Sequence, residues 1–204
     1  MKNIDQVIFD FGGVFLEVDY HATRAAFEKL GVSDFESMYS QANANTLFQD
    51  LEKGLIDESE FYKRINETCG LQLNVAQIQE AWNAMLGQYR ESSVQFLKTL
   101  KDRYKLYLFS NTNIIHMAQF RQKFRDTHEG RDFDSFFTRS FYSCDMKLRK
   151  PDIESFEWII DELGIDPTRT LFIDDSRQNI EAAAETGMQT ILLEPGVKVE
   201  DLNW

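Results

Sequence analysis

Short apolar runs that end in polar residues recur along the chain, and helical patterns separate most of them. The first run covers residues 6–9 and stops at Asp10, just before Gly12 and Gly13, as a buried strand does at a tight turn. Runs of the same kind predict further strands at residues 106–109, 136–138, 170–173 and 190–193. Apolar residues at helical spacing predict helices at residues 94–100, 153–163 and 180–185.

Residues 21–88 form the longest stretch with a helical pattern, and the sequence shows no strand pattern within it. Apolar positions predict a helix over residues 22–30. Asp57 followed by Glu60 resembles a capping box, in which two residues three positions apart cap the start of a helix reciprocally. Asn74 is predicted to be the N-cap of a further helix. The stretch is therefore expected to fold as a helical block.

The alternation of strands and helices outside this block predicts an α/β fold with a doubly wound parallel sheet and right-handed crossovers. The helical block interrupts the alternation directly after the first strand. We therefore expect a core domain built from residues 1–17 and 91–204, with residues 18–90 inserted as a small helical cap.

Polar residues follow three of the predicted strands at the points where the strands end. Asp10 follows the first strand, Ser110 and Asn111 follow a later one, and Asp174 and Asp175 follow a third. In a doubly wound sheet, ligands bind in the crevice outside the carboxyl ends of the strands. These side chains are therefore expected to converge on one crevice.

Charge and composition narrow the possible partners. The chain has 204 residues and a net charge of -12, which argues against nucleic-acid or anionic-membrane surfaces because these partners need a basic field. No apolar run reaches the length of a membrane span.

Cys69 and Cys144 show neither metal-binding nor redox spacing, and two lone thiols are typical of a reducing compartment. We expect a cytoplasmic protein, monomeric or a weak homodimer, that binds neither nucleic acid nor membrane.

Four segments of the chain resemble, in order and spacing, the four motifs of the haloacid dehalogenase (HAD-like) superfamily. They are residues 9–14 (Phe-Asp-Phe-Gly-Gly-Val), 110–113 (Ser-Asn-Thr-Asn), 149–152 (Arg-Lys-Pro-Asp) and 172–176 (Phe-Ile-Asp-Asp-Ser). The match spans about residues 7–193, and the second and third segments are most similar to the bacterial sugar-1-phosphate phosphatases. The resemblance implies a Rossmann-like core and a phosphatase that hydrolyses a small phosphorylated metabolite, with a sugar phosphate as one possibility.

The resemblance assigns Asp10 as the nucleophile, which would be transiently phosphorylated. A carboxylate that attacks a phosphate dianion is repelled by it, so a hard cation with oxygen ligands is needed, and Mg²⁺ suits this role. By the same resemblance, Asp10, the carbonyl of Gly12 and Asp175 would hold the ion.

Further residues of the motifs would act on the phosphoryl group. Ser110 and Asn111 would hydrogen-bond its oxygens, and Lys150 would neutralise them as charge develops. The choice of Lys150 over neighbouring cations depends on the Lys-Pro match. Asp174 and Asn179 would support the site without being the main ligands.

One position departs from the usual pattern. Most phosphatases of the superfamily carry a second Asp two residues after the nucleophile as general acid and base, and this chain has Gly12 there. Such a group is worth about 10²–10⁴ in rate, but the sugar-1-phosphate branch also has Gly at this position. Glu17, Asp19 or a water molecule are the alternatives for the missing proton transfer.

Two other functions compete with phosphate ester hydrolysis. A 2-haloacid dehalogenase shares the fold and the Asp nucleophile, but it attacks carbon without a metal and typically lacks the acidic pair, so Asp174 and Asp175 favour phosphoryl transfer. The second alternative is a regulatory HAD-like protein with low activity, and Gly12 is the feature that points to it.

Overall fold

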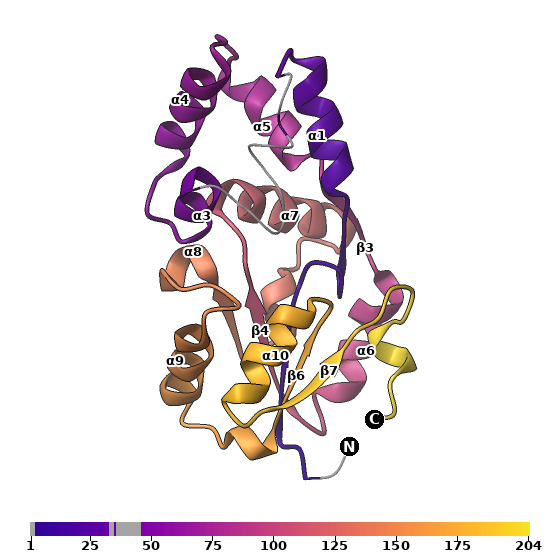
Figure 1. Cartoon of the computed structure of the whole chain (residues 1–204). Helices are drawn as coiled ribbons and strands as arrows, with labels where there is room; N and C mark the ends of the chain where they lie inside the picture. Colours follow the sequence, from indigo (N-terminus) through magenta and orange to yellow (C-terminus); the bar gives the residue numbers. More distant parts are fainter. Residues whose placement is uncertain (1–2, 33–34, 36–45) are drawn as a thin grey trace.

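Five parallel strands form a sheet in the lower half of the molecule as Figure 1 draws it. The computed structural model describes residues 3–32, 35 and 46–204. The strand order is β5-β4-β1-β6-β7, so the first strand of the chain lies at the centre. The strands are β1 (Gln6–Phe9), β4 (Lys105–Ser110), β5 (Arg139–Tyr142), β6 (Thr170–Asp174) and β7 (Gln189–Leu192). This order confirms the predicted doubly wound α/β fold.

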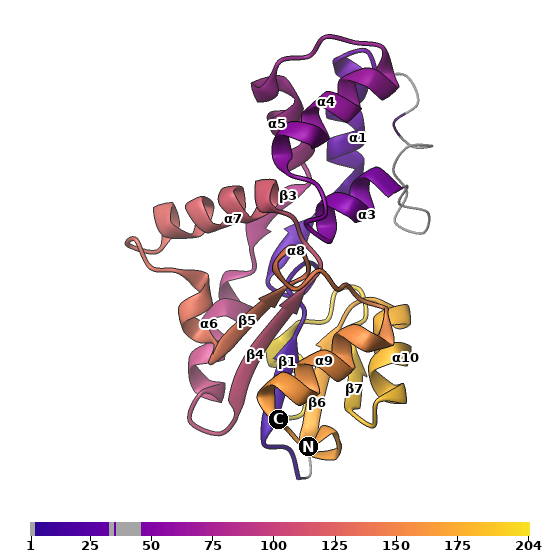
Figure 2. The ribbon, with the colours of Figure 1, turned by 90° about the vertical axis from the view of Figure 1, so that its left-hand side faces the viewer.

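Helices cover both faces of the sheet, and for this reason its central strands are apolar along their length. Val7, Ile8 and Phe9 of β1 are each at most 1% exposed. Figure 2 shows α6 and α7 on one face and α9 and α10 on the other. The helices are α6 (Glu91–Leu100), α7 (Ile114–Thr127), α8 (Ser143–Met146), α9 (Ile153–Leu163) and α10 (Arg177–Glu185), with short 3-10 turns η1 (Phe133–Phe136), η2 (Pro167–Arg169) and η3 (Val199–Asp201). In the part of the chain that the structure describes, no helix is both long and apolar enough to cross a membrane.

The strand predicted at residues 136–138 is wrong in position. Phe133 and Phe136 belong to the 3-10 turn η1, and the strand β5 begins three residues later, at Arg139. The Phe133 ring packs in the core, 5.1 Å from the ring of Phe11. Phe136 and Phe137 are buried in the same core, so they serve packing rather than strand pairing, although the backbone nitrogen of Thr138 already donates to the carbonyl of Leu106 over 2.7 Å.

A second group of helices lies above the carboxyl ends of the strands, and we call it the helical unit (Figure 1). It consists of α1 (Tyr20–Lys29), α3 (Thr46–Glu52), α4 (Glu58–Cys69) and α5 (Val75–Asn83). It has its own aromatic core, in which the buried ring of Trp82 lies 5.2 Å from Phe48 and 5.3 Å from Phe61. A core separate from that of the sheet is the usual mark of an independent structural layer.

The helix starts predicted in this unit are confirmed. Asp57 accepts a hydrogen bond from the backbone of Glu60 over 2.8 Å, but the side chain of Glu60 bonds Arg64 on the same helix. Asn74 and Gln77 form a complete capping box, with both bonds 2.9 Å long. These caps satisfy backbone donors that the first helical turn leaves without partners.

A two-stranded antiparallel ribbon connects the helical unit to the sheet. Its strands are β2 (Leu16–Val18) and β3 (Leu86–Tyr89). The prediction that residues 21–88 contain no strand is therefore wrong at β3. This strand is short and contains Gly87, which has no side chain, so it shows little β pattern. A Cβ atom at Gly87 would lie 2.7 Å from that of Glu17, so the two strands approach too closely for a larger residue.

The ribbon lies close to the expected domain boundaries. We propose that residues 18–90 form a cap and that residues 1–17 and 91–204 form the core that it covers. Residues 1–2, 33–34 and 36–45 of these predicted domains lie outside the described residues.

Candidate active site

A cleft of 830 Å³ lies between the carboxyl ends of the strands and the helical unit. Three strands supply polar residues to this place: Asp10 directly follows β1, Ser110 ends β4 and Asp174 ends β6. The cleft is lined by all but one of the site residues predicted from the sequence, namely Asp10, Gly12, Ser110, Asn111, Lys150, Asp175 and Asn179. The remaining residue, Asp174, is fully buried beneath them.

Lys150 holds the strand ends together. Its ammonium nitrogen lies 2.6 Å from Oδ1 of Asp10, 2.7 Å from Oδ2 of Asp174 and 2.9 Å from the carbonyl of Phe109. The three contacts use the three donors of an ammonium group. Lys150 is 1% exposed, and although burial alone would lower its pKa, the charges of Asp10 and Asp174 raise that pKa above its usual value. The cation is therefore fixed and stays charged.

Asp174 is surrounded by donors. Beside Lys150, its carboxylate accepts from the backbone nitrogen of Ser176 over 2.7 Å and from Nδ2 of Asn179 at 3.0 and 3.1 Å. These bonds fill its acceptor positions, so Asp174 orients Lys150 and is itself oriented by Asn179. The supporting roles of Asp174 and Asn179 stay predictions.

The carboxylates of Asp10, Asp174 and Asp175 offer oxygen atoms that all lie within 4.8 Å of one another. Burial raises the pKa of Asp10, and the negative charges of Asp174 and Asp175 raise it further, while Lys150 acts in the opposite direction. Burial and Asp174 likewise raise the pKa of Asp175. Like charges this close are mutually destabilising, and a divalent cation between them would offset the repulsion.

The backbone beside the carboxylates is shaped to let them approach. Gly13 has φ +70°, and a Cβ atom there would overlap the carboxylate of Asp175. Only glycine meets both conditions. Gly12 lines the same cleft. Carboxylate and carbonyl oxygens are the ligands that hard cations such as Mg²⁺ prefer, so these residues fit the predicted metal.

Asn111 lies in the cleft but makes a contact that the sequence does not predict. Its Oδ1 accepts from the backbone nitrogen of Lys150 over 2.9 Å, and its Nδ2 donates to the carbonyl of Lys150 over 2.8 Å. Both ends of the amide thus hold the main chain of Lys150. Within the described part of the chain, the hydroxyl of Ser110, 3% exposed, has only a long contact of 3.4 Å to the carbonyl of Asn111, so Ser110 remains the better candidate for phosphoryl binding.

The structure separates the two carboxylates considered as substitutes for an acid at Gly12. Asp19 is the N-cap of α1, and its carboxylate accepts from the backbone nitrogens of His21 and Ala22. Glu17 is exposed and lines the cleft. Of the two, Glu17 is therefore in the better position to exchange a proton with a bound molecule.

Sequence reasoning missed two groups of the helical unit that reach the cleft. Tyr20 from α1 and Glu52 from α3 line it together with Arg149 of the core, and Glu52 lies 3.0 Å from the Nε of Arg149. No motif marks Glu52, because its role depends on how the helical unit packs on the sheet. In the sequence, Arg149 is only one of the basic residues next to Lys150.

His116 is buried on α7. Its Nε2 lies 3.1 Å from the carbonyl of Trp82, and its Nδ1 lies 3.1 Å from Nδ2 of Asn113. Oδ1 of Asn113 already accepts from the backbone at Ile115 and His116, so its amide donor must face the ring. The ring is therefore neutral, and burial lowers the pKa of His116 to about 4.

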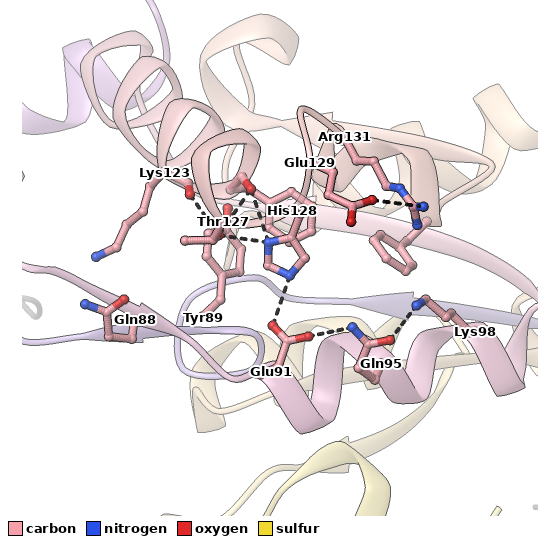
Figure 3. Close-up of a pocket in the computed structure, with 12 residues that line it drawn as sticks. Gln88, Tyr89, Glu91, Gln95, Lys98, Lys123, Thr127, His128, Glu129 and Arg131 are labelled. Carbon is pink, nitrogen blue, oxygen red and sulfur yellow. Dashed lines mark hydrogen bonds and ion pairs between the residues drawn. The ribbon is translucent and has the colours of Figure 1, made fainter.

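A second hollow, of 460 Å³, lies between α6 and the end of α7 (Figure 3). Its carboxylates are paired: Glu91 lies 2.9 Å from Nε2 of His128, and Glu129 lies 3.8 Å from Arg131. Among the described residues, the only group of three candidate metal ligands is the one at the strand ends. The phosphate chemistry is therefore expected in the cleft.

Comparison with known proteins agrees with this geometry. The sequence matches the family of haloacid dehalogenase-like hydrolases over residues 4–187. It is 30% identical over 193 residues to a D-ribitol-5-phosphate phosphatase of Bacteroides thetaiotaomicron, covering 95% of this chain and 93% of that protein.

Solved structures show the same likeness. A HAD family enzyme of Bacteroides thetaiotaomicron in complex with magnesium and inorganic phosphate superposes with a TM-score of 0.88 at 32% identity, covering 98% of this chain and 97% of that one. A predicted HAD-like family hydrolase from Porphyromonas gingivalis gives a TM-score of 0.86 at 31% identity, with 95% and 93% covered. The likeness extends over the sheet and the helical unit alike.

Proposed function

The chain belongs to the haloacid dehalogenase-like hydrolases, and on that premise we propose that it is a magnesium-dependent phosphatase of small sugar or polyol phosphates with Asp10 as the nucleophile. The observation that carries the proposal is the arrangement around Asp10. Its carboxylate lies against Lys150 and within reach of Asp175 and Asp174 at the floor of a cleft. This is the set of charges that phosphoryl transfer needs.

In the first step, a carboxylate oxygen of Asp10 forms a bond to phosphorus while the ester bond breaks and the alcohol leaves with the bonding electrons. Lys150 and the hydroxyl of Ser110 stabilise the charge on the phosphoryl oxygens. The leaving oxygen takes a proton from Glu17 or from water, because Gly12 offers none. In the second step, water attacks the phosphorus, which releases inorganic phosphate and restores the carboxylate of Asp10.

Asp10, Asp175 and the carbonyl of Gly12 would hold the magnesium ion. When bound, the ion neutralises charge between the attacking carboxylate and the phosphate. One observation supports its presence in the working enzyme: the carboxylates lie close enough to share one cation. A related enzyme was solved with magnesium and phosphate together.

Two lines of reasoning bear on the substrate class. The D-ribitol-5-phosphate phosphatase among the relatives supports a polyol phosphate. The absence of an acid at Gly12 favours leaving groups of low basicity, such as anomeric oxygens, since these need less protonation. Both classes are small phosphorylated compounds rich in hydroxyl groups, and they define the panel to be assayed.

The test is phosphate release from pentitol phosphates, sugar-1-phosphates and p-nitrophenyl phosphate, with magnesium and with chelator. We expect release that requires magnesium and is fastest within the hydroxylated esters. Halide release from 2-chloropropionate by chelated protein would show a dehalogenase instead. Failure to hydrolyse any of the esters, including p-nitrophenyl phosphate, would favour a regulatory protein.

A further inference from the structure

An ion pair joins the helical unit to the core inside the cleft. Oε2 of Glu52, the last residue of α3, lies 3.0 Å from Nε of Arg149, the residue before Lys150. The side chains are 17% and 20% exposed, and both residues line the cleft that contains Asp10. The pair therefore faces the space that the alcohol part of a substrate would occupy.

The pair is poorly satisfied. Oε2 of Glu52 and Nε of Arg149 are close, but both atoms are buried, and neither has a well-aligned hydrogen bond to any residue that the structure describes. Burial raises the pKa of Glu52, and Arg149 opposes that rise. Buried charges without full hydrogen bonding destabilise a fold, so this arrangement contributes little to stability. The remaining atoms of the two side chains account for their partial exposure, so a ligand in the cleft can reach the donors and acceptors among them.

Contacts on the next two residues hold the end of α3 in place. Lys53 lies 3.2 Å from Oδ2 of Asp152, and the carbonyl of Gly54 accepts from the ammonium group of Lys147. Their partners lie on either side of Arg149 in the sequence. The end of α3 is thus attached to the segment that carries Lys150, which fixes the orientation of the pair toward the phosphoryl site.

We propose that Glu52 and Arg149 form the subsite that binds hydroxyl groups of the alcohol part of the substrate. A hydroxyl is both donor and acceptor, so it can donate to the carboxylate and accept from the guanidinium. The two charges offset each other, so the subsite suits a neutral hydroxylated group better than a second anion. This inference rests on the proposed function and assigns residues to its selectivity for polyol and sugar phosphates.

The test compares two substrates in the full-length protein with magnesium present. In Glu52→Gln, which keeps the shape of the side chain, kcat/KM for ribitol 5-phosphate should fall about 10-fold or more, as expected for the loss of hydrogen bonds to a charged group. Hydrolysis of p-nitrophenyl phosphate, whose aryl group carries no hydroxyl, should change less than about 2-fold. Arg149→Lys keeps the charge but loses the planar fork, and it should show the same selective loss.

Glu60→Gln is the matched control, because it makes the same substitution in another ion pair of the helical unit, with Arg64, and neither of these two residues lines the cleft. It should leave both substrates nearly unchanged. If Glu52→Gln and Arg149→Lys lower kcat/KM equally for both substrates, the pair only holds the helical unit in place, and the inference is wrong. No loss of kcat/KM for either substrate would also overturn it. If the wild type hydrolyses neither ester, the proposed function itself fails and the subsite with it.

Discussion

The ammonium nitrogen of Lys150 lies 2.6 Å from Oδ1 of Asp10, although 140 positions separate the two residues in the sequence. Both residues are buried, and Asp174 lies on the other side of the same ammonium group. Lys150 therefore serves the stability of the fold as well as the proposed chemistry, and changes to it should affect both.

Replacing Lys150 by methionine should remove most of the activity and lower the free energy of unfolding by about 3 kcal/mol or more, because two buried carboxylates lose their cation. Turnover of p-nitrophenyl phosphate and urea unfolding measure the two effects. Lys147→Met is the control: this exposed lysine bonds only a backbone carbonyl of the helical unit among its described contacts. Small and equal effects for the two variants would mean that Lys150 has been assigned the wrong role.

The two acidic residues that follow the strand β6 should differ in their effects. Asp174→Asn is expected to lower the free energy of unfolding by about 1–3 kcal/mol. The substitution replaces a fully buried carboxylate by a neutral amide, so the ammonium group of Lys150 loses a charged acceptor. Asp175→Asn should not lower stability, since Asp175 is exposed and its charge lies close to that of Asp174, but it should weaken magnesium binding about 10-fold or more. Magnesium titration of activity and thermal unfolding separate the two. The reverse pattern would contradict the proposed ligand set.

Gly13→Ala should abolish activity, because a Cβ atom would overlap the carboxylate of Asp175. The positive φ adds a conformational cost of about 1–2 kcal/mol to the folded state. Gly70→Ala is matched to it, since Gly70 has φ +64° and open space around its Cβ position. Both variants should lose similar conformational stability, and only Gly13→Ala should lose turnover. Normal activity in Gly13→Ala would show that Asp175 does not need this approach.

His116 should make stability depend on pH. Burial lowers its pKa to about 4 in the folded protein, against about 6.5 in the unfolded chain. Between these values the unfolded state binds more protons, so stability is fully present above pH 6.5 and falls as the pH drops toward 4, by about 3 kcal/mol in all. Urea unfolding from pH 7.5 to 4.5 should show this loss in the wild type. His116→Gln should lose less over the same range, and parallel curves for the two proteins would contradict the assignment of a neutral ring.

The convergence of Asp10, Ser110 and Asp174 could be predicted because the carboxyl ends of parallel strands meet at one edge of the sheet. Each of these residues follows a run that is apolar enough to be read as a buried strand. The order of the motifs then singles out Lys150 among the neighbouring basic residues. In the structure, Lys150 contacts Asp10 and Asp174. These predictions needed the local pattern of apolar residues and the order of the motifs along the chain.

The parts that could not be predicted depend on packing between distant segments. Helix α7 was not predicted, because its buried face includes His116 while Ile114 is exposed, which blurs the apolar stripe. The position of β5 was wrong because aromatic residues ahead of it fill the core instead of pairing. The contact of Glu52 with Arg149 has no signal in either local sequence, since it exists only when the helical unit is docked on the sheet.

The most direct test of the central claim is to identify the residue that carries the phosphoryl group during turnover. Borohydride reduces an acyl phosphate to an alcohol, so quenching the wild type with borohydride during hydrolysis of p-nitrophenyl phosphate would convert a phosphorylated aspartate to homoserine. Mass spectrometry of the digested protein is expected to show homoserine at position 10, and only when substrate and magnesium are present. Continued turnover with Asp10 unmodified, or homoserine at another position, would contradict the account.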